Sequence, residues 1–361
     1  MLDQLLSHLR DVAPDRAEID VLQPADPFLE TAGEALRRRI FLTESVEGQI
    51  HCLRPEFTIP ICLHHLTQAG DANTPKRYAY GGTVFRQARE GAAEFLQTGL
   101  EDLGNGDLIA ADSACLRDLV SALALAGIAS PKIDLGDQNL FEVVVENLQL
   151  PVAIAQRLMR GFGSPQLIED QIDRLTRGET DQTEEDAATS LARSGDRAAL
   201  IDHIEQRMAQ SNIAPQSGRS PAAIADRMIE KIQESQFRLS DTDAGILRAF
   251  LAIQSPLQQA TEALEQFAKR TGIEFGAAGK AFQQRVTALQ HVGVGLDMIT
   301  YKASFGRGLE YYTGLLFEAR VGATSIAGGG RYDRLCSLLG SKLPIPAVGF
   351  SISLDRLEDV R

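Results

Sequence analysis

The period of the hydrophobic positions changes along the chain. Near the N-terminus, five apolar residues recur at three- and four-residue intervals, which predicts an amphipathic helix. They are Leu2, Leu5, Leu6, Leu9 and Val12. Further on, alternating or short apolar runs bounded by Gly and Pro are typical of β-strands. Strands are expected at residues 19–25, 49–54, 78–86, 94–103, 132–135, 315–320, 325–327 and 347–352.

The middle of the chain has a helical pattern instead. Residues 139–290 keep helical spacing over most of their length, and Ser220-Pro221 is a helix-start signal. Residues 178–197 are acidic, polar and poor in large apolar side chains, so we expect a surface excursion there. Shorter helices are expected at residues 31–39, 61–68 and 108–127. Strand-rich ends around a helical middle predict one α+β domain over residues 1–361, an antiparallel sheet flanked by helices with a helical insertion at about 140–290.

The amino-acid composition limits which partners and which cellular location are expected for the protein. The chain has 49 acidic and 36 basic residues, a formal net charge of −13. A long polyanion is held mainly through Lys and Arg, so this balance gives no support to a tRNA partner. No apolar run reaches the roughly 18 residues of a membrane helix, and no secretory signal precedes the first helix. We therefore expect a cytoplasmic protein with no membrane partner.

The cysteines and histidines show no metal-site spacing. No two of the four cysteines form a C-x-x-C pair, and the six histidines are scattered. The thiols are interpreted as reduced and buried, and neither a metal nor a cofactor is expected.

Four short segments, far apart in the sequence, carry the candidate chemistry. They are residues 53–58, residues 80–86 with 97–101, residues 306–314, and residues 328–333 with 349–356. Each motif alone is weak, but four in this order over roughly 300 residues are strong evidence. Together they resemble the catalytic domain of histidyl-tRNA synthetases. The resemblance implies the class II aminoacyl-tRNA synthetase fold, in which an antiparallel sheet carries the amino-acid pocket.

The resemblance also implies a site for histidine. Glu56, Thr58 and Gln97 match the residues that hold the α-amino group, where a carboxylate makes a charge-assisted hydrogen bond. Glu101 matches the residue that accepts an imidazole N–H. Tyr312 and Tyr332 match the tyrosines that line the imidazole slot. Arg86, Arg307 and Arg356 match arginines that meet the carboxylate and the ATP phosphates in the synthetase. The expected histidine-binding set is Glu56, Thr58, Arg86, Gln97, Glu101, Arg307, Tyr311, Tyr312 and Tyr332.

Other positions depart from a synthetase. The chain ends five residues after Arg356, where a synthetase continues into an anticodon-binding domain, so no such domain is expected. Ala88 replaces the glutamate that holds the adenine amino group, and Ala93 replaces a second arginine of the same loop. Ser353 replaces a glycine that admits ATP closely. A preserved amino-acid pocket beside an eroded ATP site is similar to the regulatory subunits of ATP phosphoribosyltransferase, which share the Phe-Thr-Ile-Pro run at residues 57–60.

That resemblance implies a regulatory role without catalytic residues. The expected partner is a short-form ATP phosphoribosyltransferase catalytic subunit, which the chain would activate in the first step of histidine biosynthesis while relaying allosteric feedback by histidine. A homodimer is expected through the region around Pro24 and the strand before it. Two alternatives stay open. One is a truncated enzyme that forms histidyl-adenylate, because Arg307 survives; the other is a different synthetase-derived partner protein.

Overall fold

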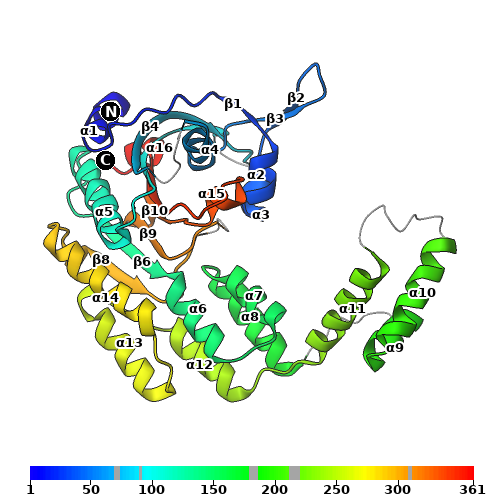
Figure 1. Ribbon diagram of the computed structural model, residues 1–361. Coiled ribbons are helices and arrows are strands. Elements are labelled where there is room, and N and C mark those ends of the chain that lie inside the picture. The colour runs from blue at the N-terminus through cyan, green and yellow to red at the C-terminus, as the bar shows by residue number, and fades with distance from the viewer. Residues whose placement is uncertain (69–73, 89–91, 179–185, 211–219, 308–310) are drawn as a thin grey trace. The chain divides into compact units, whose positions relative to one another are not determined.

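The computed structural model describes residues 1–68, 74–88, 92–178, 186–210, 220–307 and 311–361 (Figure 1). The chain divides into two compact units. The first comprises residues 1–147, 162–164 and 249–361, and the second comprises residues 148–161 and 165–248. Each unit is described by itself.

The first unit is built on an eight-stranded sheet with the order β4-β5-β11-β10-β9-β6-β8-β7. Its strands are β4 (Lys76–Phe85), β5 (Glu94–Leu103), β6 (Lys132–Asp137), β7 (Gln254–Pro256), β8 (Ile299–Lys302), β9 (Leu315–Val321), β10 (Thr324–Arg331) and β11 (Ala347–Ser353). Neighbouring strands are antiparallel except β6 and β8, which are parallel. The expected α+β class with an antiparallel sheet is confirmed.

Helices cover the sheet (Figure 1). They are α1 (Leu2–Val12), α2 (Asp26–Thr31), α3 (Glu34–Arg37), α4 (Thr58–Gln68), α5 (Leu108–Leu125), α6 (Gln138–Asn147), α13 (Leu257–Thr271), α14 (Gly276–His291), α15 (Leu335–Leu338) and α16 (Leu354–Glu358), with a 3-10 turn at Leu296–Met298. The α5 helix begins where the Asp107 carboxylate accepts the N–H of Ala110 at 3.0 Å. Both α1 and α14 pack against α5, whereas α4 packs against α15.

A core on the α4 side of the sheet fixes the surroundings of the later site. Phe28 from α2, Ile59 and Ile61 from α4, and Tyr78 and Tyr80 from β4 are buried in one cluster. Burying aliphatic and aromatic side chains of this size contributes about 1.5–3 kcal/mol each. The N-terminus of α4 is therefore held firmly against the strands.

A small second sheet extends the first unit. It has the order β1-β3-β2, with β1 at Leu22–Pro24, β2 at Leu42–Glu44 and β3 at Ile50–Leu53. Both pairings are antiparallel. In Figure 1 the turn between β2 and β3 projects away from the rest of this unit. Five large apolar residues on and beside these strands are exposed: Val21, Leu22, Leu42, Val46 and Ile50.

The second unit is helical where it is described. Its helices are α7 (Val152–Gly161), α8 (Pro165–Arg177), α9 (Ala187–Ser194), α10 (Arg197–Gln210), α11 (Pro221–Gln236) and the larger part of α12 (Asp241–Leu251). The expected start of a helix at Pro221 is confirmed. The segment expected as a helical insertion, about 140–290, covers this unit and continues into the first unit through β7, α13 and α14.

The segment at residues 178–197 contains a helix. Within residues 178–197, expected as a surface excursion, α9 is a helix whose first turn is capped by Asp186. Ala188 and Ala192 are buried against neighbouring helices, so small apolar side chains are enough to anchor it. Residues 179–185 lie outside the described part of the chain.

In the described parts, none of the helices combines the length and the apolar character needed to cross a bilayer. The four cysteines, Cys52, Cys62, Cys115 and Cys336, are buried and unpaired.

Candidate ligand-binding site

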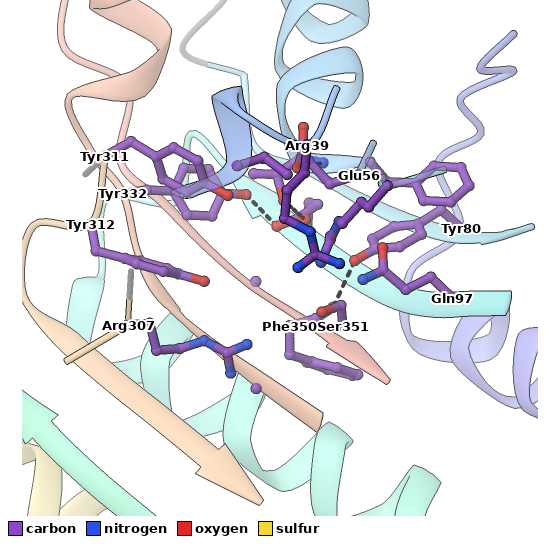
Figure 2. A pocket seen from close by; sticks show the side chains of 17 residues that line it. Arg39, Glu56, Tyr80, Gln97, Arg307, Tyr311, Tyr312, Tyr332, Phe350 and Ser351 are labelled. Atoms are coloured by element: carbon purple, nitrogen blue, oxygen red, sulfur yellow. Dashed lines mark hydrogen bonds between the residues drawn. The ribbon is translucent and has the colours of Figure 1, made fainter. Parts of the chain in front are cut away.

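A cavity of about 290 Å³ lies within the first unit, and all nine expected site residues line it. Gln97 and Glu101 lie on β5, Glu56 and Thr58 at the start of α4, Arg86 directly after β4 and Tyr332 directly after β10, and Arg307, Tyr311 and Tyr312 complete the set (Figure 2). Eight further lining residues were not expected: Leu36, Arg39, Phe57, Tyr80, Gly328, Gly349, Phe350 and Ser351. The four motifs, separated along the chain, therefore meet at one place.

Glu56 sits at the junction between β3 and α4. Its carboxylate accepts the backbone N–H of Thr58 at 2.6 Å and that of Ile59 at 3.0 Å. These are N–H groups that the first turn of a helix leaves unpaired, and their positive dipole stabilises a carboxylate. Burial raises the pKa of Glu56, while the two backbone hydrogen bonds and the charge of Arg86 oppose that rise.

Glu101 lies deeper and is held by two hydroxyl groups. Its Oε1 accepts the hydroxyl of Thr58 at 2.7 Å, and its Oε2 accepts the hydroxyl of Tyr332 (Figure 2). Burial raises the pKa of Glu101 to about 8, against the effect of these hydrogen bonds. The raised pKa favours the protonated form of the Glu101 carboxyl, which can either donate or accept a hydrogen bond.

Two glycines make room for charged side chains. Gly349 faces Glu101 across the β5–β11 pairing, and a methyl group there would overlap the Glu101 carboxyl. A methyl group on Gly328, in β10, would overlap the guanidinium of Arg307. The glycines at these two positions let the sheet itself serve as a wall of the cavity.

Three arginines face the cavity, and each donates a hydrogen bond to a different backbone carbonyl. Arg86 Nε donates to the Pro55 carbonyl at 2.7 Å, Arg39 Nε to the Gln87 carbonyl at 2.8 Å, and Arg307 Nη1 to the Phe317 carbonyl at 3.4 Å. Burial lowers the pKa of Arg86; Glu56 opposes this effect, whereas the charges of Arg39 and Arg307 add to it. The Arg86 guanidinium is thus close enough to those of Arg39 and Arg307 to be repelled by each of them.

Aromatic rings form a further wall of the cavity. The Tyr311 ring centroid lies 5.2 Å from that of Tyr312 and 6.0 Å from that of Tyr332, the latter pair edge to face. The Tyr80 hydroxyl donates to the Phe350 carbonyl at 3.0 Å, as Figure 2 shows. Flat rings with polar tips can bind a planar heterocycle on their faces and edges.

Gln97 is buried on β5, in register with Gly82 and Ser353. Of these three residues, only Gln97 is among those that line the cavity. Ser353, which replaces a glycine of the synthetase and was expected to crowd a nucleotide, ends β11 immediately before α16.

Other positions singled out by the resemblance lie elsewhere. Arg356 is exposed and is not among the described residues that line the cavity; its Nη1 donates to the Ser325 carbonyl at 3.3 Å. Ala88 is exposed, and the Ala93 carbonyl accepts the N–H of Arg86 at 2.7 Å. Residues 89–91 and 308–310 lie outside the described part of the chain. Within the described part, no cluster of three or more His, Cys, Asp or Glu residues is placed to hold a metal ion.

Arg39 is the lining residue that sequence reasoning missed most consequentially. It is the last of three consecutive arginines, the first of which ends α3, and has no motif around it. Three hydrogen bonds connect this part of the chain to Gln87. The Gln87 N–H donates to the Arg39 carbonyl, Arg39 Nε donates to the Gln87 carbonyl, and Gln87 Nε2 donates to the Ile40 carbonyl. Arg37 and Arg38 offer the same chemistry, so only the tertiary approach of the 85–88 segment distinguishes Arg39.

The chain is similar to known proteins in sequence and in fold. A profile of the histidyl-tRNA synthetase family matches residues 5–228 and 214–357. An ATP phosphoribosyltransferase regulatory subunit from Agrobacterium fabrum is 45% identical over 99% of this chain and 96% of its own length. Another from Allorhizobium ampelinum is 47% identical over 96% of this chain and 93% of its own.

Solved structures show the same fold at lower sequence identity. An ATP phosphoribosyltransferase regulatory subunit/histidyl-tRNA synthetase from Bacillus halodurans superposes with a TM-score of 0.64 at 20% identity, covering 99% of this chain and 78% of that one. A histidine–tRNA ligase subunit from Alicyclobacillus acidocaldarius gives a TM-score of 0.56 at 22% identity, covering 99% and 90%. The chain belongs to the ATP phosphoribosyltransferase regulatory subunit family, whose members share the class II fold of histidyl-tRNA synthetases.

Proposed function

We propose that this chain is a non-catalytic regulatory subunit that binds histidine and activates a separate, short-form ATP phosphoribosyltransferase catalytic subunit in the cytoplasm. One observation carries the proposal: a single cavity combines buried carboxyl groups, arginines and tyrosines. That combination suits a zwitterion with an imidazole. The volume, about 290 Å³, is at the small end of the roughly 300–1,000 Å³ of ligand pockets, as an amino acid requires.

The pose follows from the chemistry of each wall. The α-ammonium group lies against Glu56, Thr58 and Gln97, since the Glu56 carboxylate keeps free acceptor capacity after binding two N–H groups. The imidazole lies between Glu101 and the tyrosine rings. A carboxyl on one imidazole nitrogen and a hydroxyl on the other would select histidine over residues that lack either nitrogen.

Feedback by histidine requires that histidine binding favours one of two arrangements of the complex with the catalytic subunit. The decisive experiment mixes the chain with the catalytic subunit and measures phosphoribosyl transfer with and without histidine. We expect turnover to rise on mixing and to fall when histidine is added. Unchanged turnover in both steps would remove the regulatory role.

Histidine binding is tested separately by calorimetry on the isolated chain. Replacing Glu101 by Ala should weaken histidine binding by about 1–3 kcal/mol, the cost of leaving a buried polar group unpaired. Glu94→Ala, on the exposed end of the same strand, is the matched control and should leave the affinity unchanged. Equal affinities for the two variants would remove Glu101 from the site.

A second candidate function is a truncated enzyme that forms histidyl-adenylate. It is favoured by Arg307, which lines the cavity as a catalytic arginine would. Arginines position phosphates, but they do not select adenine, and Ala88 carries no group that would. Histidine-dependent exchange of pyrophosphate into ATP at about 1 per second or faster would establish this alternative and end the regulatory proposal.

The chain is further proposed to form a homodimer through the small sheet, with no tRNA as partner. The sheet β1-β3-β2 has two edge strands and five exposed apolar side chains. Unpaired edges with apolar side chains favour association. A second copy supplies the same surface, and self-complementary surfaces close in pairs.

A further inference from the structure

A short turn between α7 and α8 interrupts the second unit. Residues 162–164 belong to the first unit, although the chain on both sides of them, residues 148–161 and 165–248, forms the second. We call these three residues the 162–164 turn. Because α7 ends at Gly161 and α8 begins at Pro165, each end of the turn is attached directly to a helix of the second unit.

Phe162 anchors this turn on aromatic side chains of the first unit. Its ring stacks on Phe141 of α6, with 5.2 Å between the centroids and 24° between the planes. Phe141 stacks in turn on Phe250 at 6.0 Å, and both of these rings are fully buried. Rings stacked in a close-packed interior have little room to slide, so the turn is held in one position.

Gly163 brings the backbone of the turn against the backbone at Gly306. A methyl group on Gly163 would lie 2.5 Å from the Gly306 Cα, and one on Gly306 would lie 2.6 Å from the Gly163 Cα. Gly163 also has a φ of +85°, in the left-handed region that glycine adopts without strain. Glycine is therefore required on both chains where the two backbones meet.

A second close approach holds the same segment against β6. A methyl group on Gly136, in β6, would overlap the carbonyl oxygen of Phe305. The backbone of residues 305 and 306 thus touches both the sheet and the 162–164 turn. All of these contacts lie within the first unit. Backbone atoms packed this closely pass a displacement on to their neighbours rather than absorb it.

Arg307 follows this segment directly, and its side chain points into the cavity beside Tyr312 (Figure 2). Its Nη1 donates to the Phe317 carbonyl at 3.4 Å. Because that distance exceeds the usual length of an N–H···O hydrogen bond, the contact holds the guanidinium only weakly. The place of the Arg307 side chain therefore depends on the backbone at Gly306.

We propose that the 162–164 turn positions Arg307 and thereby couples histidine binding in the cavity to the state of helices α7 and α8. The inference rests on the proposed function for the identity of the ligand. Phe162 and Gly163 act as positioning residues, since neither is among the described residues that line the cavity. The coupling is reciprocal: helices that alter histidine affinity by some factor are altered by histidine to the same extent.

Calorimetry with histidine on the full chain compares Gly163→Ala with Gly195→Ala. Gly195 has a similar φ of +73°, but a methyl group there meets nothing within 4 Å, so its variant has the backbone strain without the collision. We expect Gly163→Ala to weaken histidine binding at least about tenfold, the loss of one charge-assisted hydrogen bond. Gly195→Ala should change the affinity less than about twofold. Equal affinities for the two variants overturn the inference.

Phe162→Ala tests the same turn without a backbone collision and covers the case in which Gly163→Ala does not fold. It should weaken histidine binding at least about threefold, and Phe162→Leu should recover part of that loss. The control is Phe275→Ala, which removes a ring that packs on Phe250 and Phe267. This control should lower the free energy of unfolding and leave histidine affinity within about twofold. An equal affinity loss in Phe275→Ala would indicate general loss of packing and overturn the inference.

Hydrogen exchange provides a readout that a purely structural role of the turn would not change. Saturating histidine should slow the exchange of amides in residues 155–168 of the wild type at least about threefold, and leave those of α10 unchanged. In Gly163→Ala, or in Phe162→Ala, the slowing should disappear even when the variant is saturated with histidine. Histidine binding to the wild type without this slowing defeats the inference and leaves the proposed function standing. Absence of histidine binding to the wild type defeats both.

Discussion

The protonation of the Glu101 carboxyl affects the stability of the folded protein. In the unfolded chain its carboxyl ionises near its usual pKa of about 4.3, whereas burial raises the folded-state value to about 8. The folded state therefore holds a proton that the unfolded state has lost. The stabilising contribution is complete below pH 4 and is lost as the pH rises through 8.

We therefore expect the ligand-free protein to lose stability between pH 5 and 8, by an amount on the order of 2–4 kcal/mol from this residue. Glu101→Gln keeps the shape without the titration and should have a flatter profile. Urea unfolding at several pH values, in parallel for the wild type and Glu101→Gln, measures the difference between the two slopes. Parallel profiles would show that the Glu101 pKa is not raised.

A second residue-scale prediction concerns Gly328. The three atoms nearest to a methyl group there belong to the Arg307 guanidinium, the flexible end of a side chain. Gly328→Ala should therefore displace Arg307 from the cavity while changing the free energy of unfolding by less than about 1 kcal/mol. Ligand affinity should fall at least about tenfold, the loss of a charge-assisted contact.

The control for this substitution is Gly106→Ala, where a methyl group meets nothing within 4 Å. Calorimetry with histidine, together with urea unfolding, distinguishes the outcomes. If Gly328→Ala unfolds the protein, Gly328 serves the packing of the sheet rather than the placement of Arg307.

At the scale of elements, a buried ion network joins helices α5 and α14 to strands β6 and β10. Asp112 on α5 accepts from Arg285 of α14 at 2.7 Å and from Arg331 of β10 at 2.6 Å. Arg285 also donates to Asp137, at the end of β6, at 2.8 Å. Arg331 directly precedes Tyr332, so the network fixes the strand that presents this tyrosine to Glu101.

Asp112→Asn should destabilise the protein by about 3–5 kcal/mol, because it leaves two buried arginines with one carboxylate fewer. The matched control is Asp226→Asn in the exposed Arg197–Asp226 pair, which should cost less than about 1 kcal/mol. Thermal or urea unfolding of both variants compares the two costs. A loss of less than 1 kcal/mol for Asp112→Asn would mean that the network does not support the fold.

The elements show what the sequence could and could not predict. Strand pairs with clear turns, such as β4 and β5, were predicted within two residues, because alternation reports the buried face of a strand. The short apolar run before the glycines was predicted to end at residue 327, yet β10 continues to Arg331. There glycine reflects close approach to β9 and β11 rather than a turn.

The site shows the same division. Motif residues such as Glu56 and Glu101 were identified because their neighbours in the sequence are distinctive. Arg39 and the Asp112–Arg285 pair were missed because nothing local marks them. Asp112 and Arg285 are 173 residues apart, and only the packing of α5 against α14 brings them together. Periodicity carries no information about a contact of that separation.

At the scale of the whole molecule, the proposed dimer depends on the small sheet β1-β3-β2. Val46 is fully exposed in the turn between β2 and β3, and Leu42 on the edge strand β2 is 55% exposed. Burying side chains of this size against a second copy contributes about 1.5–3 kcal/mol each. A carboxylate placed in the same interface would have to be desolvated without a partner.

We expect the wild type to have twice the 39.2 kDa mass of one chain in light scattering at micromolar concentration. Leu42→Asp combined with Val46→Asp should halve that mass. Val152→Asp, at a 74% exposed position on α7 of the second unit, makes the same chemical change elsewhere and should leave the mass unchanged. A wild type that is monomeric, or a double variant that stays dimeric, would exclude this sheet as the dimer interface. The exposed apolar side chains would then be available to a different protein. If the double variant no longer activated the catalytic subunit, that protein would be the catalytic subunit; if it still did, the catalytic subunit would bind elsewhere.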